Sequence, residues 1–497
     1  MDKIMKKILI ANRGEIACRV ISTCQEMGIK TVAIYSEIEK DALHVQLADE
    51  AVCLGDGPLQ NTYLNKQKIV QIAKDLKVTG IHPGYGFLSE NAEFCELVES
   101  NKIVFIGPKT EHIQLMGDKI SSKQKMQDIG VPVIPGYQGK IQDKEGLKKQ
   151  ARAIGYPILI KATAGGGGKG MRIVEREENF SAELESAKRE ALSSFGNDDV
   201  LIEKYITKPR HIEVQVMSDT HGNHLHFFER ECSIQRRYQK IVEETPSVAL
   251  SEELRQKICQ TAVQISSAIN YRGAGTVEFI LDQDGSFFFL EMNTRLQVEH
   301  PITEMVTGAD LVRLQIQVAN GEKIQIKQNE IYQRGHAIEV RIYAEDPSNQ
   351  FFPTTGDVYF IGETRRPGVR LDTGVKDGDK IGVNFDPMVA KLITYASNRN
   401  NCISKMNKAI KELPFLGLTT NRSYLLKVLN HEAFKNGETF TNFISTYAEL
   451  NEVNNFDEEL AIALLVDHLT TSKITSTNSA TFTQGHEDFT GFRNQLL

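Results

Sequence analysis

Short apolar runs alternate with amphipathic stretches over the first hundred residues. One apolar run covers residues 8–11 and a second covers residues 31–35. Between them, apolar positions with helical spacing fall at Ile16, Val20, Cys24 and Met27. Gly28 stands where a helix C-cap is expected. The pattern predicts a strand, a helix and a parallel strand, the opening of a Rossmann-like sheet.

Two further apolar runs, at residues 78–81 and 104–106, extend this predicted parallel sheet. Open α/β sheets bind ligands beyond the carboxyl ends of their strands, where the glycine-rich loop 82–87 lies. The same glycines also fit a tight turn that has no ligand. The loop after the first strand, residues 12–15, lacks the Gly-x-Gly-x-x-Gly pattern, and NAD binding is therefore not expected.

A glycine run interrupts a second region, at about residues 133–205. Predicted strands at 158–160 and 171–174 flank it, and Lys161 follows the first of them. The glycines concerned are Gly165, Gly166, Gly167, Gly168 and Gly170. Adjacent glycines cost backbone entropy and leave amide groups free to approach phosphate oxygens. The spacing is not that of a Walker P-loop. A flexible linker is the alternative, which the flanking strands disfavour.

Two acidic residues are expected to face each other on a hairpin. Residues 276–281 and 287–292 read as strands, with a four-residue loop if Asp282 pairs with Phe287. In that register Glu278 faces Glu291. Directly opposed carboxylates repel, so the pair makes sense around a divalent cation, with Asn293 as a further oxygen ligand. Oxygen ligands favour Mg²⁺ or Mn²⁺. A solvent-facing pair in another register is the alternative.

Composition narrows the class of protein. The 497 residues suffice for several domains, and the net charge of -7 with no evident basic stripe argues against nucleic acid as the main partner. Seven cysteines without a Cys-x-x-Cys pair are expected to be reduced thiols in a cytoplasmic protein. The apolar run near the N-terminus ends at Asn12, too early for a signal peptide or a membrane span.

Five motifs in order and spacing resemble those of biotin carboxylases, an ATP-grasp family, over about residues 7–447. They are Ala11–Ala17, His82–Asn91, the glycine run after Lys161, Gln235–Glu244 and Arg341–Pro347. The segment Glu291–His300 closely resembles the carboxylase signature of the same family. The resemblance implies a mixed α/β and α+β chain built on an ATP-grasp fold.

The resemblance also implies a division of the chain into parts. A Rossmann-like pre-ATP-grasp domain is expected over residues 1–115, and an ATP-grasp domain over 116–330 with a mobile lid at about 133–205. A C-terminal biotin carboxylase domain is expected over 331–447. The family pattern stops after Tyr447, and the residues themselves predict a short helix and a flexible tail rich in serine and threonine over 448–497.

The same resemblance assigns chemistry to single residues. It implies ATP-driven carboxylation of biotin by bicarbonate, through carboxyphosphate. Glu299 matches the general base for bicarbonate, and Lys240, Arg295 and the amide of Val298 match the groups that hold the anion. Arg341 matches the arginine that stabilises the ureido oxygen of biotin. Tyr85, together with Phe87, is a candidate apolar wall for the biotin ring, with core packing as an equal alternative.

A second set of matching residues concerns the nucleotide. Lys119, Lys161 and the glycine run are expected to contact ATP phosphates, with Glu278 and Glu291 holding two Mg²⁺ or Mn²⁺ ions. The remaining matches are the adenine-reading hinge Glu203, Lys204, Tyr205 and Ile206, and the nucleotide-binding residues His211, Gln235 and Tyr238. Tyr238 departs from the family, in which this position is often histidine. A phenol is not cationic near neutral pH, so a modest change in contacts is expected.

The family carries biotin on a lysine, typically within Met-Lys-Met, and this tripeptide does not occur here. A separate biotin carboxyl carrier protein and a separate carboxyltransferase subunit are therefore expected, with the chain as a homodimer and no membrane partner. Acetyl-CoA or propionyl-CoA is the expected final acceptor, and pyruvate is the alternative. Another ATP-grasp ligase, joining a carboxylate to an amine, and a non-catalytic scaffolding subunit remain as competing hypotheses.

Overall fold

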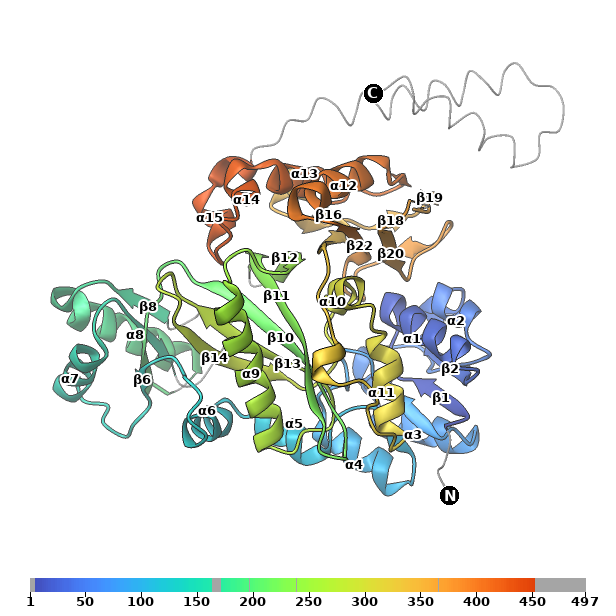
Figure 1. The fold of residues 1–497 in the computed structure, drawn as a ribbon, viewed down its shortest axis with the longest axis horizontal. Coiled ribbons are helices and arrows are strands. Elements are labelled where there is room, and N and C mark those ends of the chain that lie inside the picture. The colour runs from blue at the N-terminus through green and yellow to red at the C-terminus, as the bar shows by residue number, and fades with distance from the viewer. Residues whose placement is uncertain (1–4, 163–170, 196, 238, 365, 452–497) are drawn as a thin grey trace, which may run out of the picture. The chain divides into compact units, whose positions relative to one another are not determined.

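A five-stranded parallel sheet with helices forms the N-terminal part of the chain in this computed structural model (Figure 1). Its strands, in the order β3-β2-β1-β4-β5, are β1 (Lys7–Ile10), β2 (Lys30–Tyr35), β3 (Glu50–Cys53), β4 (Gly80–His82) and β5 (Val104–Phe105). Its helices are α1 (Gly14–Glu26), α2 (Leu43–Leu47), α3 (Lys66–Asp75), α4 (Ala92–Ser100) and α5 (Thr110–Gly117). The predicted strand-helix-strand opening is confirmed, with Gly28 at a φ of 69° just after α1.

The structure describes residues 5–162, 171–195, 197–237, 239–364 and 366–451. Several predictions concern residues outside these ranges. They are the phosphate contacts of Gly165, Gly166, Gly167, Gly168 and Gly170, the role of Tyr238, and the helix and tail beyond residue 451.

A small antiparallel sheet follows, in the order β6-β9-β7-β8. It consists of β6 (Gly136–Tyr137), β7 (Ile158–Ala162), β8 (Met171–Val174) and β9 (Val200–Lys204). Helices α7 (Lys144–Ile154) and α8 (Phe180–Phe195) accompany it. Leu147 from α7 and Leu184 from α8 pack against Ile158 and Ile160, so this region, predicted as a lid, has a core of its own.

An eight-stranded antiparallel sheet carries most of the candidate site residues. Its order is β14-β13-β10-β11-β12-β15-β22-β20. The strands are β10 (Arg210–Ser218), β11 (His224–Arg236), β12 (Gln239–Thr245), β13 (Gly273–Leu281), β14 (Phe287–Asn293), β15 (His336–Tyr343), β20 (Val369–Thr373) and β22 (Met388–Ala396). The helices of this part are α6 (Lys119–Asp128), α9 (Glu252–Ala268), α10 (His300–Thr307) and α11 (Leu311–Ala319). Because β12 pairs with β15, the sheet continues across the predicted boundary near residue 330.

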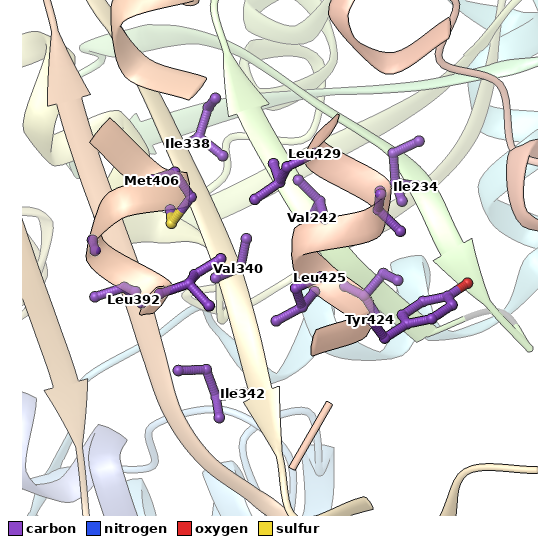
Figure 2. Packing of buried hydrophobic residues seen from close by; sticks show 14 of the residues in the cluster. Ile234, Val242, Ile338, Val340, Ile342, Leu392, Met406, Tyr424, Leu425 and Leu429 are labelled. Carbon is purple, nitrogen blue, oxygen red and sulfur yellow. The ribbon is translucent and has the colours of Figure 1, made fainter. Parts of the chain in front are cut away.

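Two helices cover one face of this sheet near its C-terminal strands, α12 (Arg399–Glu412) and α13 (Arg422–Asn430) (Figure 2). Met406 and Leu425 from the helices pack with Val242, Val340 and Leu392 from the strands. The short elements of this part are β16 (Glu345–Asp346), β17 (Phe352–Pro353), β18 (Gly356–Asp357), β19 (Phe360–Ile361), β21 (Lys380–Ile381), β23 (Phe415–Leu416), α14 (Glu432–Lys435) and α15 (Phe443–Thr446). The shared core fixes β15 and β22 side by side, and both strands reach the site.

The predicted hairpin forms, but its turn differs from the prediction. Leu281, and not Asp282, pairs with Phe287, so the loop is one residue longer than expected. The register then shifts between Glu278 and Phe279, where Leu290 is the extra residue on β14. This irregularity, a β-bulge, offsets the longer turn, and Glu278 faces Glu291 as predicted.

Candidate active site

The opposed carboxylates of β13 and β14 are unequal in their surroundings. Glu278 is buried, and its Oε2 lies 2.8 Å from Nε2 of His211. Its Oε1 accepts hydrogen bonds from Asn293 Nδ2 at 2.8 Å and Gln297 Nε2 at 2.9 Å. Burial would raise the pKa of Glu278, but Lys240 and His211 lower it overall.

The second carboxylate, Glu291, is pushed toward its neutral form. Burial raises the pKa of Glu291 and the charge of Glu278 raises it further, while Lys119 opposes both effects. Lys119 lies at the start of α6 and is exposed. A divalent cation would remove the repulsion between the two carboxylates, and their oxygen donors suit Mg²⁺ or Mn²⁺. The side chains present therefore fit the predicted metal.

Asn293, the third predicted metal ligand, is turned differently from the prediction. Its amide nitrogen points to Glu278, and its Oδ1 accepts a hydrogen bond from Arg295 Nη2 at 3.1 Å. This oxygen has a second lone pair that could ligate a cation. Arg295 also binds Glu90, with Nε 2.8 Å from the carboxylate, so the predicted anion-binding arginine is tied to the loop before α4.

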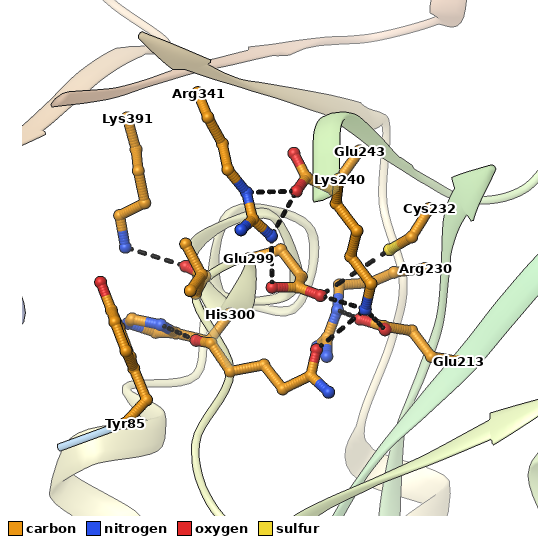
Figure 3. Close-up of polar contacts among 12 residues, drawn as sticks. Tyr85, Glu213, Arg230, Cys232, Lys240, Glu243, Glu299, His300, Arg341 and Lys391 are labelled. Atoms are coloured by element: carbon orange, nitrogen blue, oxygen red, sulfur yellow. Dashed lines mark hydrogen bonds and ion pairs between the residues drawn. The ribbon is translucent and has the colours of Figure 1, made fainter. Parts of the chain in front are cut away.

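A buried cluster of alternating charges surrounds Glu299, the predicted base (Figure 3). Its Oε1 lies 2.7 Å from Nζ of Lys240, and its Oε2 lies 3.0 Å from Nη2 of Arg341. Lys240 also binds Glu213 at 2.6 Å, and Arg341 binds Glu243 through Nε at 2.7 Å. Each oxygen of Glu299 thus faces a cation, and three of the four predicted catalytic residues are in direct contact.

These contacts fix the charge of Glu299. Burial would raise the pKa of this carboxyl group, but Lys240, Arg341 and Arg230 together hold it well below its usual range. A carboxylate stabilised in this way is a weak base while both cations face it. An anion that paired with Lys240 and Arg341 in place of Glu299 would raise the basicity of Glu299. The cluster therefore suits proton transfer from a bound anion.

The region predicted to bind nucleotide holds a second buried carboxylate between two lysines. Glu203 contacts Lys161 and Lys123, one through each carboxylate oxygen. Burial would raise the pKa of Glu203, but the two lysines lower it overall. Lys161, the predicted phosphate-binding lysine, is therefore paired with Glu203 at the start of the hinge, and its contact with a phosphate remains a prediction.

Part of the backbone of the predicted hinge is hydrogen-bonded to neighbouring segments of the protein. The amide of Lys204 donates to the Pro135 carbonyl at 2.8 Å, and the amide of Tyr205 donates to Pro157 at 3.0 Å. An adenine base would therefore have to hydrogen-bond other backbone groups of this segment, which continues to the buried Ile206.

Two other predicted nucleotide residues touch each other. Gln235 Nε2 lies 2.8 Å from Nδ1 of His211, whose other ring nitrogen faces Glu278. The imidazole thereby connects the predicted nucleotide residues to the predicted metal pair.

The two residues of the predicted biotin wall have different surroundings. Phe87 stacks on Tyr63 with ring centroids 5.1 Å apart and belongs to the N-terminal core. The Tyr85 hydroxyl contacts the buried carboxylate of Glu15. Gly84 allows the close approach of Asn12, since a Cβ there would lie 2.8 Å from Asn12 Nδ2.

Several residues of the cluster were not predicted from the sequence. They are Glu213, Arg230, Glu243, Gln297 and Lys391. Glu213 follows His211 by two positions on β10, a spacing that puts both on one face of a strand. Lys391 is the single charged residue within β22. The sequence pattern could therefore have identified both Glu213 and Lys391 as candidate site residues.

Three family models match the sequence. "Biotin carboxylase, N-terminal domain" matches residues 4–113, "Carbamoyl-phosphate synthase L chain, ATP binding domain" matches 118–327, and "Biotin carboxylase C-terminal domain" matches 339–446. Biotin carboxylase 1 of Bacillus subtilis is 48% identical over 89% of this chain and 99% of its own length. The chain belongs to the biotin carboxylase family. The predicted fold class, an ATP-grasp chain with a parallel N-terminal sheet, is thereby confirmed.

Some relatives within this family are longer proteins. The rat mitochondrial methylcrotonoyl-CoA carboxylase subunit alpha is 51% identical over 88% of this chain, which spans 61% of that relative's length. Among solved structures, the biotin carboxylase domain dimer of Hydrogenobacter thermophilus 2-oxoglutarate carboxylase, in complex with MgADP, ADP and bicarbonate, has a TM-score of 0.83. It is 44% identical, and the match covers 91% of this chain and all of that chain. Within the described ranges, none of the helices has the length and apolar character needed to cross a bilayer.

Proposed function

We propose that this chain catalyses the ATP-dependent carboxylation of biotin by bicarbonate, through carboxyphosphate. The observation that carries the proposal is the buried contact of Glu299 with Lys240 and Arg341, next to the opposed pair Glu278 and Glu291. Bicarbonate is a poor electrophile and must be deprotonated and phosphorylated. The cluster offers one base and two cations within a few ångströms of each other, which suits this demand.

In the proposed reaction each residue of the cluster has its own role. Lys240 and Arg295 bind the bicarbonate oxygens together with the amide of Val298, and Glu299 accepts the bicarbonate proton. Arg341 then stabilises the negative charge on the ureido oxygen of biotin. Tyr85 borders the biotin site.

The nucleotide side of the site is part of the same proposal. Lys119 and Lys161 bind ATP phosphates, together with the glycine run 165–170. The hinge, His211, Gln235 and Tyr238 hold the nucleoside. Glu278, Glu291 and Asn293 hold Mg²⁺ or Mn²⁺, which would neutralise phosphate charge.

The test is the rate of ADP release with Mg²⁺, ATP and bicarbonate, with and without free biotin. We expect biotin to stimulate turnover and Glu299→Gln to lower it by about 100-fold or more, the usual contribution of a general base. Glu229→Gln is the matched control, because Glu229 is a buried carboxylate held by Arg255 at 2.9 Å. It should retain turnover within a few-fold.

Two other outcomes would contradict the proposal. Turnover that ignores both biotin and bicarbonate would favour a ligase joining a carboxylate to an amine. Nucleotide binding without turnover would favour the scaffolding hypothesis.

We further propose that biotin arrives on a carboxyl carrier protein and that a carboxyltransferase passes the carboxyl group to an acyl-CoA, with this chain acting as a homodimer. The absence of Met-Lys-Met from the sequence supports a carrier outside these residues. The expected acceptors are acetyl-CoA and propionyl-CoA. The name of the rat relative adds methylcrotonoyl-CoA, and a neighbour described as the biotin carboxylase subunit of pyruvate carboxylase keeps pyruvate as the alternative. Transfer of labelled bicarbonate to each acceptor in the assembled complex would separate them.

A further inference from the structure

Lys391 is a fully buried lysine next to the cluster that the proposed mechanism uses. Its side chain on β22 has no exposed surface. Its Nζ donates to the carbonyl oxygen of Val298 at 2.8 Å and lies 3.1 Å from Oε2 of Glu15. Burying a lysine costs a large desolvation energy unless its charge is paired and hydrogen-bonded. Both of these partners belong to segments at the proposed site.

The sheet places this lysine directly beside Arg341. The two residues face each other in the ladder between β15 and β22. Arg341 holds the side chain of Glu299, and Lys391 holds the carbonyl of the residue before it, Val298 (Figure 3). The adjacent strands β15 and β22 thus bind consecutive residues of one loop. Arg341 on β15 binds the Glu299 carboxylate, and Lys391 on β22 binds the Val298 carbonyl.

The contact between Lys391 and the Val298 carbonyl lies next to the start of a helix, because Glu299 is the N-cap of α10. The Val298 carbonyl belongs to the peptide that joins Val298 to Glu299, so a donor on it restricts how that peptide rotates. The direction of the Glu299 side chain depends on this rotation. A small turn of the peptide would move the carboxylate away from Lys240 and Arg341.

Carboxylates on neighbouring elements keep the lysine charged. Burial would lower the pKa of Lys391, but the charges of Glu15 and Asp372 help to raise it overall. Glu15, at the start of α1, also receives the Tyr85 hydroxyl. A chain of contacts therefore runs from Tyr85 through Glu15 and Lys391 to the Val298 carbonyl.

We propose that Lys391 is a positioning residue for bicarbonate activation, because its ammonium group holds the Val298–Glu299 peptide in the orientation that sets Glu299 between Lys240 and Arg341. Glu15 fixes this ammonium group and the Tyr85 hydroxyl together. The inference rests on the proposed function for its kinetic consequence, but the restriction of the peptide is a property of the fold alone.

The test compares Lys391→Met with Lys405→Met. Lys405 is a matched control on α12, because its ammonium group also holds backbone carbonyls, of Pro367 at 3.1 Å and Tyr395 at 2.8 Å, away from the loop. We expect Lys391→Met to raise the KM for bicarbonate and lower kcat by about tenfold or more, with the dissociation constant for ATP changed less than twofold. Lys405→Met should leave all three values within twofold.

A second measurement reads the loop without turnover. Hydrogen exchange of the amides in residues 296–303 should become faster in Lys391→Met and stay unchanged in Lys405→Met. If Lys391→Met does not fold, Lys391→Gln replaces it, since an amide group still donates to the carbonyl but lacks the charge. Its KM for bicarbonate and its exchange should then lie between wild type and a full loss of the contact.

The outcomes separate this inference from the proposed function. Wild-type turnover that ignores bicarbonate and biotin removes the proposed function, and the exchange data still decide whether Lys391 restrains the loop. Biotin-stimulated turnover with an unchanged KM and unchanged exchange in the variants overturns the inference alone. A loss of ATP binding equal to the loss of bicarbonate binding would also overturn it, because it would indicate a merely structural role.

Discussion

The buried carboxyl groups of Glu299, Glu243 and Glu339 differ in pKa because their neighbours differ. Glu299 is held ionised by the cations that face its two oxygens. Burial raises the pKa of Glu243 to about 7 against the opposing charge of Arg341. Glu339 faces Glu243 across the ladder between β12 and β15, and burial raises its pKa well above the usual range. The ionised Glu299 at the start of α10 therefore lies beside a sheet row, Glu243 and Glu339, whose carboxyl groups have raised pKa values.

The substitution Glu339→Gln tests whether Glu339 is protonated in the folded protein. The folded-state pKa of Glu339 lies above its unfolded value of about 4.3. The folded state thus keeps a proton that the unfolded state releases, and stability falls as pH rises above about 4.3. A glutamine avoids this loss. We expect the variant to be more stable than wild type by on the order of 1 kcal/mol at pH 7, with the gain vanishing near pH 4.

Denaturant unfolding at pH 4.5 and pH 7 would measure the effect. Glu253→Gln, at an exposed position in the first turn of α9, serves as the control. A variant less stable than wild type at pH 7 would mean that Glu339 is ionised and paired in the native protein.

At this scale the sequence predicted which residues meet, but not how they are arranged. The opposition of Glu278 and Glu291 followed from strand periodicity, although the bulge at Leu290 could not be read from it. Glu243 and Gln297 were missed because a lone glutamate or glutamine carries no periodic signal. Their roles depend on side-chain contacts between strands distant in sequence.

Single strands were predicted well because their apolar runs are short and bounded. The order of the eight-stranded sheet was not predicted, since the pairing of β12 with β15 joins residues about a hundred positions apart. Such long-range pairing leaves no local pattern. A buried ion cluster marks this junction, where Glu244 on β12 meets His336 on β15 at 2.9 Å and Arg399 on α12 at 2.6 Å.

Arg399→Met should show how much this junction contributes to stability. The substitution leaves the buried Glu244 without its guanidinium partner, and the breaking of a buried pair costs about 3 to 5 kcal/mol. We expect a loss of about 3 kcal/mol in the free energy of unfolding. Arg366→Met, at a half-exposed arginine that binds Glu412, should cost less than about 1 kcal/mol. Equal losses in the two variants would show that the junction adds nothing specific.

The molecule as a whole contains buried neutral histidines that make it sensitive to acid. Burial lowers the pKa of His44, His82 and His112 to about 4. All three belong to the N-terminal sheet and its helices. This property could not be predicted from the sequence, because a histidine's burial depends on how separate helices close over the sheet.

The sign of the effect follows from proton uptake. Below about pH 6.5 the unfolded chain binds protons at these histidines, whereas the folded chain does not until pH falls toward 4. Each histidine therefore removes stability between about pH 6.5 and 4, on the order of 1 kcal/mol at pH 5.5. We expect the melting temperature to fall from pH 7.5 to pH 5.5, and His44→Gln to reduce that fall. His221→Gln, at an exposed histidine, should leave it unchanged. An equal fall in His44→Gln and wild type would assign the acid sensitivity to other groups.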